Sequence, residues 1–404
     1  MALSVREPYG SIEGQPEPRR VTVLGSTGSV GCSTLDLLER NPQSFEVEAL
    51  TAMSNVARLA EQALRHRPAL VVIADERHYP ALKAALSGTG IEVAAGREAL
   101  LYAARRPADW VMAAIVGAAG LEPTLAAIER GAIVGLANKE TLVCAGDIVM
   151  RQVALSEATL LPVDSEHSAI FQVFDSAHAG AVERIILTAS GGPFRTIHPS
   201  QLHSVTPAQA VAHPNWTMGA KISVDSATMM NKGLEVIEAS HLFPVAPERI
   251  EIVVHPQSVI HSMVEYVDGS VLAQLGTPDM RTPIAYALSW PARMAAPAKR
   301  LDFANLSALT FEAPDAERFP ALRVAREALQ SGGNAPTILN AANEVAVTAF
   351  LEGRIRFLDI VSVVEGTLGE IPNTPLATLA EVRAADGVAR EVAERRAGAM
   401  PRPS

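Results

Sequence analysis

The stretch VTVLGSTGSVG, Val21–Gly31, decides how the chain begins to fold. Its first residues are apolar or β-branched, as in a buried strand, and Gly25, Gly28 and Gly31 follow at regular spacing. Glycines between a strand and a helix allow a tight turn, and they let a phosphate approach backbone N–H groups at the helix N-terminus. The pattern predicts a nucleotide-binding turn. The alternative is an ordinary glycine-rich turn, because the spacing is GxxGxxG rather than GxGxxG.

Short apolar runs and helical patterns alternate from this stretch as far as residue 164. Strands are predicted at 21–25, 45–51, 69–75, 110–117 and 132–138, and helices at 30–42, 55–68 and 121–131. Buried strands that alternate with helices are typical of a parallel sheet covered on both faces. We therefore expect an α/β fold with a Rossmann-like domain over residues 21–164, preceded by a flexible extension at 1–20.

The rest of the chain reads as three further parts. Residues 165–290 contain HSMVEYVDGSVLAQL, two alternating strands around an Asp-Gly turn, which predicts a central α+β domain with an antiparallel hairpin. Residues 291–320 are rich in proline and lack periodicity, as a linker does. Helical patterns dominate residues 321–404, which predicts a C-terminal α-helical domain.

Composition narrows the possible functions. The chain has 404 residues, a hydrophobic fraction of 48% and a formal net charge of −10. An acidic chain has no general attraction to nucleic acid or to an anionic membrane. No apolar run is long enough for a membrane helix, and the N-terminus lacks the apolar core of a secretory signal. Two cysteines, Cys32 and Cys144, cannot form a disulfide scaffold. We expect a cytoplasmic globular protein with a small-molecule ligand.

The end of the second predicted strand bears on the choice of nucleotide. An NAD site usually places an acid there for the ribose hydroxyl. Residues 52–55, Ala-Met-Ser-Asn, contain no acid, which favours NADP, whose 2′-phosphate an acid would repel. They contain no base either, and Arg58 is the nearest cation in the sequence. The residues alone leave this choice open.

Two carboxylates stand in an apolar setting in LPVDSEHSAIFQ, residues 161–172. On a strand, Asp164 and Glu166 would share one face, and they would repel each other unless a proton or a cation lay between them. Glu235 follows Lys232 on a predicted helix, and with Asp164 and Glu166 it would form an all-oxygen site suited to Mg²⁺ or Mn²⁺. The alternative is that Glu235 pairs with Lys232 on a solvated face.

Neighbouring segments offer groups that bind anions. We expect the helix that carries Asn231 and Lys232 to begin near Asp225 or Ser226. Ser190 ends a strand in TASGGPF, where glycines let the backbone approach a phosphate. These groups predict a phosphate subsite.

Two further segments have both a functional and a structural interpretation. AHPNWTMGAKIS contains His213, Trp216 and Gly219 in no regular element, which suggests a lid over a ligand or a Trp that pins a surface loop. Lys139, in LANKE, follows a strand of the nucleotide domain. It either reaches the reacting centre or pairs with Glu140.

Taken together, these motifs resemble the 1-deoxy-D-xylulose 5-phosphate reductoisomerase family. The resemblance extends from Val21 to the C-terminal helices and rests, in order, on GSTGSVG, AAIVGAAGL, LANKETLV, PVDSEHSAIFQ, SGGPFR, HPNWTMGAKISVDSATMMNKGLE, IHPQSVIHSMV and LAQLGTPDMRTPIAYAL. It implies a homodimer in which residues 21–164 bind NADPH and residues 165–290 form the catalytic and dimerisation domain. One departure is Met53-Ser54-Asn55, where the family usually has Gly-Lys/Arg-Asn, so the preference for NADPH over NADH could be reduced.

The resemblance also implies the site residues. Asp164, Glu166 and Glu235 would bind a divalent metal (Mn²⁺, Mg²⁺ or Co²⁺), and these acids and Lys139 would form the catalytic set. The implied substrate contacts are Ser165, Glu166, Ser190, His213, Trp216, Ser226, Asn231, Lys232 and Glu235. The implied cofactor contacts are Thr27, Gly28, Ser29, Val30, Asn55, Asn138, Lys139, Glu140 and Gly219. His167 and His261 match family histidines, and their roles stay open.

The implied reaction is a metal-dependent rearrangement of 1-deoxy-D-xylulose 5-phosphate followed by reduction with NADPH. Its product is 2-C-methyl-D-erythritol 4-phosphate, in non-mevalonate isoprenoid precursor biosynthesis. Two alternatives are another NAD(P)-dependent dehydrogenase without metal and a non-catalytic dinucleotide sensor. A metal-free dehydrogenase would not need three converging acids, and a sensor would have no reason to carry Lys232 and Glu235 on one helix face. We expect no nucleic acid and no membrane among the partners of this protein.

Overall fold

The computed structural model describes residues 17–216, 218–306 and 308–401. Residues 1–16, where we expect most of the flexible extension, lie outside the described residues. The first strand begins at Arg19, earlier than the sequence predicts, because Arg19 and Arg20 pair with Phe45 and Glu46 in a parallel ladder. The prediction that residues 19 and 20 belong to the extension is therefore wrong.

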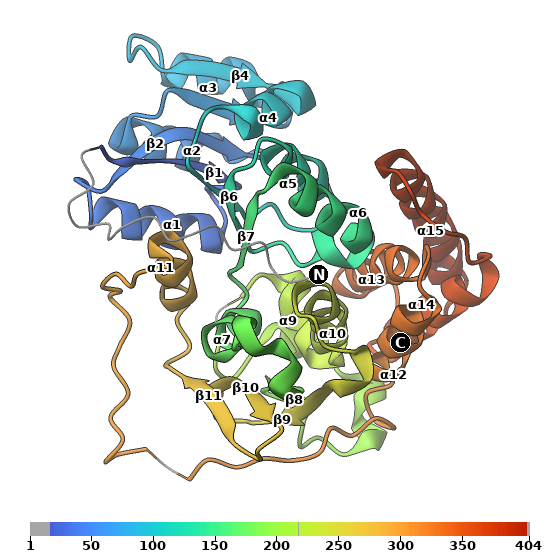
Figure 1. Ribbon diagram of the computed structural model, residues 1–404. Helices are drawn as coiled ribbons and strands as arrows, with labels where there is room; N and C mark the ends of the chain where they lie inside the picture. The colour runs from blue at the N-terminus through green and yellow to red at the C-terminus, as the bar shows by residue number, and fades with distance from the viewer. Residues whose placement is uncertain (1–16, 217, 307, 402–404) are drawn as a thin grey trace.

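Within the described residues, seven parallel strands form the first sheet, in the order β4-β3-β2-β1-β5-β6-β7. Its strands are β1 (Arg19–Leu24), β2 (Phe45–Ala52), β3 (Leu70–Ile73), β4 (Glu92–Ala95), β5 (Trp110–Ala113), β6 (Ile133–Leu136) and β7 (Thr159–Pro162). The sheet occupies the upper left of Figure 1. Apart from the edge strand β4, its strands are almost entirely buried, as a parallel sheet covered on both faces requires.

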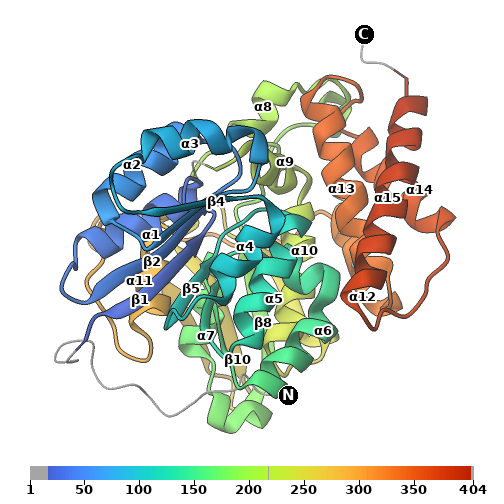
Figure 2. The ribbon, with the colours of Figure 1, turned by 90° about the horizontal axis from the view of Figure 1, so that it is seen from above.

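Helices cover both faces of this sheet, as Figure 2 shows from above. The apolar core on one face includes side chains of α1 (Ser29–Glu39), α2 (Val56–His66), α3 (Tyr79–Ala85) and α11 (Arg281–Ser289). The core on the other face includes α4 (Gly96–Arg105), α5 (Leu121–Glu129) and α6 (Glu140–Ser156). The helix α11 comes from the segment expected to form the central domain, yet it packs on the first sheet, where Trp110 Nε1 donates to Ala287 O at 3.1 Å.

The described residues contain a second, mixed sheet of four strands in the order β11-β10-β8-β9. The strands are β8 (Val182–Ala189), β9 (Ile250–Val254), β10 (Ile260–Tyr266) and β11 (Val271–Leu275), and β10 and β11 form the predicted hairpin. The helices α7 (Ser165–Val173), α8 (Pro207–Val211), α9 (Ala220–Thr228) and α10 (Met230–Leu242) belong to this part of the chain. Short 3-10 turns lie at Glu76–His78, Ala118–Gly120, Ser176–Ala181, Pro199–Ser204 and Pro247–Arg249.

The helix predicted to begin near Asp225 or Ser226 is in fact two helices. The helix α9 already begins at Ala220, and Met229 ends it with a left-handed φ of 63° before α10 starts at Met230. A left-handed residue interrupts a helical ladder, and a sequence rich in small residues hides such a break. The predicted start is therefore wrong by several residues.

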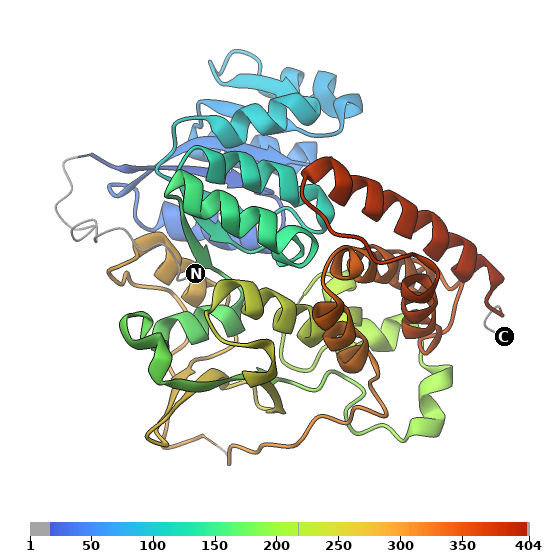
Figure 3. The same cartoon turned by 45° about the vertical axis from the view of Figure 1, so that its right-hand side comes forward.

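The chain then crosses the lower edge of the molecule and enters a bundle of helices at its right in Figures 1 and 3. Residues 291–320 contain no helix among the described residues, and their one bridge joins Glu312 to Val254 at the end of β9. The bundle consists of α12 (Ala321–Ser331), α13 (Ala335–Leu351), α14 (Asp359–Glu370) and α15 (Leu379–Ala399). The helix α13 also packs against α6 and α9.

The architecture confirms the predicted fold class: a Rossmann-like parallel sheet, a central α+β unit and C-terminal helices. Among the described helices, none combines the length and the apolar character that crossing a membrane requires.

Candidate active site

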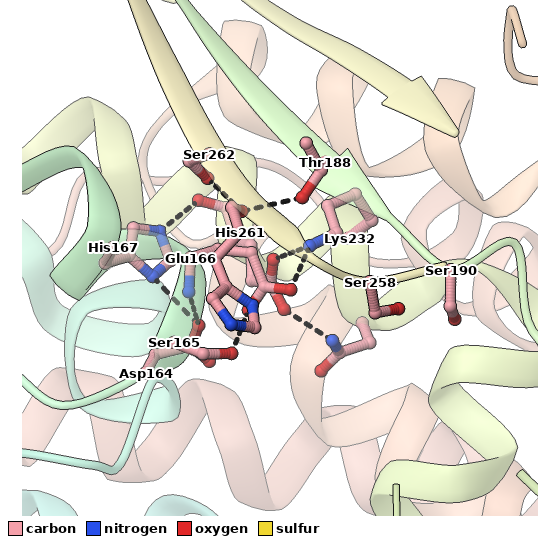
Figure 4. Close-up of polar contacts among 12 residues, drawn as sticks. Asp164, Ser165, Glu166, His167, Thr188, Ser190, Lys232, Ser258, His261 and Ser262 are labelled. Atoms are coloured by element: carbon pink, nitrogen blue, oxygen red, sulfur yellow. Dashed lines mark hydrogen bonds and ion pairs between the residues drawn. The ribbon is translucent and has the colours of Figure 1, made fainter. Parts of the chain in front are cut away.

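Three carboxylates converge where the first sheet meets α10. Asp164 caps α7 by accepting a hydrogen bond from the backbone N–H of Glu166 at 3.2 Å, so both acids lie at a helix N-terminus. The expectation that they share a strand is wrong, because β7 has already ended at Pro162. Glu235 reaches the same place from α10, and carboxylate oxygens of all three acids lie within 4.8 Å of one another. Figure 4 shows Asp164 and Glu166 in this cluster.

The ammonium group of Lys139 lies inside the cluster. Its Nζ is 2.8 Å from Asp164 Oδ2 and 3.0 Å from Glu235 Oε1, and it donates to Asn231 Oδ1 at 2.9 Å. Burial opposes the charged form, but the attraction of Asp164 and Glu235 outweighs it and raises the pKa of Lys139 well above its usual value. Lys139 does not pair with Glu140, which instead binds Lys221.

Lys232 is the second cation of the cluster. It pairs with Glu235, as the structural interpretation of that helix face expects, and its Nζ lies 3.4 Å from Glu166 Oε1. The face is not solvated, however, because Lys232 and Glu235 are both buried. Burial raises the pKa of Glu166 to about 7, and the neighbouring carboxylates of Glu235 and Asp164 act in the same direction, although Lys232 opposes them.

His167 and Glu238 form a second layer behind the acids that sequence reasoning did not identify as a pair. His167 Nε2 donates to the backbone carbonyl of Glu235 at 2.9 Å, and Nδ1 faces Glu238 Oε2 at 3.2 Å and Asp164 Oδ1 at 3.5 Å. Burial opposes the charged imidazole, but Glu238 and Asp164 raise the pKa of His167 to about 9. Glu238 lies one helical turn beyond Glu235, and that spacing is the signal that could have revealed it.

The donor set fits a divalent cation. Three carboxylates supply only oxygen ligands, which hard cations such as Mg²⁺ and Mn²⁺ prefer. Asp164 and Glu166 are partly accessible from a cavity, so substrate oxygens could complete the coordination.

That cavity has a volume of about 530 Å³ and brings most of the predicted site together. The predicted residues that line it are Ser29, Val30, Lys139, Asp164, Ser165, Glu166, Ser190, His213, Trp216, Gly219, Ser226, Asn231, Lys232 and Glu235. Asp279 and Arg281 also line it and were not predicted, although they lie in the quoted motif GTPDMRTP. A loop motif carries no periodicity, so only the resemblance could have drawn attention to them.

The loop from His213 to Trp216 folds over one side of the cavity. His213 Nδ1 accepts the backbone N–H groups of Asn215 at 3.2 Å and Trp216 at 3.0 Å, so Nε2 donates to Ser190 Oγ at 2.9 Å if the ring is neutral. Burial lowers the pKa of His213, which favours that neutral form. The Trp216 ring lies 6.1 Å from the ring of His261.

A larger cavity of about 870 Å³ adjoins the glycine-rich turn and is lined by Thr27, Gly28 and Met53. The turn fits a dinucleotide. Gly25 has a φ of +85°, and a Cβ atom on Gly31 would lie only 2.4 Å from Gly25 O, so the turn needs glycine at both positions. The N-terminus of α1 lies between the two cavities, because Ser29 and Val30 line the smaller one.

Three predicted cofactor residues do not line either cavity, because their side chains bind within the protein. Asn55 caps α2 through the Arg58 N–H at 3.1 Å. Asn138 donates to Gly117 O at 2.8 Å and accepts from Thr141 N at 2.7 Å. Glu140 accepts from Lys221 at 2.9 Å.

A glycine-rich turn on a parallel sheet, followed by a helix whose N-terminus lines the same cavity as a carboxylate cluster, defines the class of dinucleotide-dependent oxidoreductases with a cation site. Family models narrow the class. Residues 21–146 match 1-deoxy-D-xylulose 5-phosphate reductoisomerase, residues 160–243 match its C-terminal domain, and residues 275–392 match the DXP reductoisomerase C-terminal domain. The chain belongs to the 1-deoxy-D-xylulose 5-phosphate reductoisomerase family, which confirms the resemblance seen in its motifs.

Individual relatives support the same family assignment. The chain is 67% identical over 375 residues to the reductoisomerase of Rhodospirillum centenum, covering 93% of each protein. It is 59% identical over 382 residues to that of Caulobacter vibrioides, covering 93% of this chain and 96% of the relative. The solved Zymomonas mobilis enzyme in complex with NADPH superposes with a TM-score of 0.90 at 55% identity, over 96% of this chain and 100% of that one. A solved DOX-P reductoisomerase in complex with NADPH, fosmidomycin and magnesium superposes with a TM-score of 0.89 at 41% identity, over 94% of this chain and 98% of that one.

Proposed function

We propose that the chain converts 1-deoxy-D-xylulose 5-phosphate into 2-C-methyl-D-erythritol 4-phosphate, using NADPH and a divalent cation. One observation carries the proposal: the acid cluster, the anion-binding residues and the N-terminus of α1 all line one cavity. A hydride donor, a cation and a phosphate group can therefore act on one small substrate there. The names of the relatives, and the NADPH and magnesium in the titles of solved ones, support the same reaction.

Asp164, Glu166 and Glu235 are the residues that would hold the cation. When bound, a divalent cation polarises a carbonyl and lowers the pKa of a neighbouring hydroxyl, which is what this rearrangement needs. Lys139 would lie beside the reacting oxygens, because it already binds Asp164 and Glu235. Ser165, whose hydroxyl donates to Glu166 Oε2 at 2.7 Å, orients that carboxylate and borders the substrate.

The phosphate subsite, Ser190, Ser226, Asn231 and Lys232, would anchor the far end of the substrate. Anchoring a non-reacting group supplies binding energy that positions the reacting carbon atoms. The neutral form of His213 suits this role, because its Nε2 donates to Ser190 Oγ and leaves the hydroxyl proton of Ser190 free for the phosphate. The loop from His213 to Trp216 would exclude water from the aldehyde before its reduction.

NADPH would supply the hydride, with its pyrophosphate at the turn of Thr27, Gly28, Ser29 and Val30. Backbone groups of Asn55, Asn138, Glu140 and Gly219 are the further contacts we propose, since the first three side chains are engaged elsewhere. The absence of a base at Met53 and Ser54 predicts a weaker hold on the 2′-phosphate.

The family resemblance supports three further parts of the proposal. They are a homodimer formed through the central domain at 165–290, a cytoplasmic location, and a place in non-mevalonate isoprenoid precursor biosynthesis. The division of the chain at residues 164, 290 and 320 belongs to the same proposal.

The variant Glu235→Gln tests the function. It keeps the size of the side chain and removes one ligand charge, so turnover should fall at least a hundredfold and Mn²⁺ affinity should fall, while NADPH binding stays near wild type. Glu317→Gln is the matched control, because Glu317 is exposed and far along the sequence from the cluster. A Glu235→Gln protein with full activity would overturn the cation assignment.

A further inference from the structure

A second buried ion network lies outside the acid cluster and joins all three parts of the fold. Lys221 Nζ is 2.9 Å from Glu140 Oε1 and 2.9 Å from Asp225 Oδ2. Asn343 Nδ2 donates to Asp225 Oδ1 at 2.7 Å. Glu140 begins α6, Lys221 and Asp225 lie on α9, and Asn343 comes from α13 in the C-terminal bundle.

Lys221 is the cation that pairs directly with both acids of the network. Glu140, Asp225 and Asn343 are 4%, 1% and 0% exposed, so water cannot replace a lost partner. Burial opposes the charge on Lys221, but Asp225 and Glu140 outweigh it and raise the pKa of its ammonium group. A buried carboxylate without its cation is strongly destabilised, so the pair between Lys221 on α9 and Glu140 on α6 helps to hold these two helices in their relative position.

Each end of the network adjoins residues of the proposed site. Glu140 directly follows Lys139, whose ammonium group lies in the acid cluster. Asp225 directly precedes Ser226, which lines the 530 Å³ cavity as part of the phosphate subsite. The N-terminus of α9 at Ala220 directly follows the loop that carries His213 and Trp216.

The helix α9 is also a separate segment from α10. Met229, at φ 63°, divides α9 from α10, which carries Asn231, Lys232 and Glu235. A left-handed residue between two helices lets one of them shift while the other stays in place. A shift of α9 would move Ser226 and Lys221 together, and Lys221 would transmit it to Glu140.

We propose that Lys221 is a positioning residue that couples the phosphate subsite to the cofactor loop at residues 138–140. This inference rests on the proposed function, because the two coupled ligands are NADPH and the substrate's phosphate. Phosphate at Ser226 fixes α9, Lys221 passes this constraint to Glu140, and the backbone of residues 138–140 is held in position for the cofactor. Because the two binding equilibria are linked, each ligand should increase the affinity for the other by the same factor.

The test measures NADPH affinity by fluorescence titration, with and without saturating inorganic phosphate. Phosphate should tighten NADPH binding about tenfold in the wild type and should have almost no effect in Lys221→Met. Lys221→Arg keeps the charge and should restore most of the effect. Arg326→Met is the matched control: Arg326 also joins the C-terminal bundle to the central sheet, but its hydrogen bond, to Ile250 O at 2.7 Å, ends on β9 and not on α6 or α9.

Stability and turnover are measured on the same proteins. If Lys221→Met does not fold, Glu140→Gln replaces it, because Lys221 then still pairs with Asp225 on its own helix while its link to α6 is weakened. A folded Lys221→Met or Glu140→Gln protein that keeps the tenfold effect would show that the network is only structural and would overturn the inference. A wild type that turns over substrate but shows no phosphate effect would overturn it too and leave the proposed function standing. A wild type without turnover would count against the proposed function instead.

Discussion

Lys139 Nζ lies 2.8 Å from Asp164 Oδ2, in the space where the carboxylates of the acid cluster converge. The ammonium group therefore already neutralises part of the carboxylate charge that a bound divalent cation would neutralise. The lysine and the cation compete for the same oxygens, and this competition makes the site sensitive to substitution at Lys139.

Lys139→Met should tighten Mn²⁺ binding and still abolish activity. Removing the ammonium group leaves Asp164 and Glu235 without their closest cation, so Mn²⁺ affinity in the absence of substrate should rise about tenfold, or ~1.4 kcal/mol. Turnover should fall at least a hundredfold, because Lys139 borders the reacting oxygens. Electron paramagnetic resonance of free Mn²⁺ measures the affinity. Lys299→Met, at an exposed position, should change neither quantity; weaker Mn²⁺ binding in Lys139→Met would contradict the competition.

Ser54→Arg should sharpen the choice of nucleotide. The variant places a guanidinium at the end of β2, where the family usually has a base and where a 2′-phosphate is recognised. The ratio of the NADH and NADPH dissociation constants should rise about tenfold. Ser87→Arg adds the same charge at an exposed turn and should leave the ratio unchanged. An unchanged ratio in Ser54→Arg would place the 2′-phosphate away from this loop.

Trp216 should report closure of the loop. The sequence contains three tryptophans, and Trp110 and Trp290 are buried at 0% and 7% exposure. Substrate binding should therefore change the tryptophan fluorescence through Trp216, and Trp216→Phe should remove most of that change. The same variant should raise KM more than it lowers kcat, because the ring contributes to enclosure rather than to proton transfer. A fluorescence change of wild-type size in Trp216→Phe would exclude the loop as a lid.

His261 should make the fold less stable in acid. Burial lowers its pKa from 6.5 to about 4, so between these values the unfolded chain binds a proton that the folded chain does not. The free energy of unfolding therefore falls as pH decreases from 6.5 to 4, with a contribution of about 3 kcal/mol from this residue. Urea unfolding of His261→Gln should show a flatter decline over that range. His203→Gln, at an exposed position, should follow the wild type; an identical decline in His261→Gln would contradict the assignment.

The sequence predicts the parallel sheet well because buried strands leave continuous apolar runs, as in Val21–Leu24 and Leu70–Ile73. It misses β4 (Glu92–Ala95), an edge strand with exposed and half-buried residues and no such run. It also merges α9 and α10, because Met229 is a residue type that helices favour and nothing local indicates its left-handed backbone.

The site shows the same division between local and distant information. The spacing of Lys232 and Glu235 predicts a shared helix face, and the structure confirms that they meet. The contacts of Lys139 with Asp164 and Glu235 join residues far apart in the chain, so only the resemblance indicates them. The partners of His167 and Lys221 are also distant, and their roles follow from burial and from the geometry of the folded chain.

The most direct test follows the absorbance of NADPH at about 340 nm. The protein is mixed with NADPH, 1-deoxy-D-xylulose 5-phosphate and either Mn²⁺ or Mg²⁺, and a chelator is then added. NADPH should be lost only when substrate and cation are both present, and the reaction should stop when the chelator is added. No loss of NADPH with either cation, in protein that still binds NADPH, would contradict the proposed function.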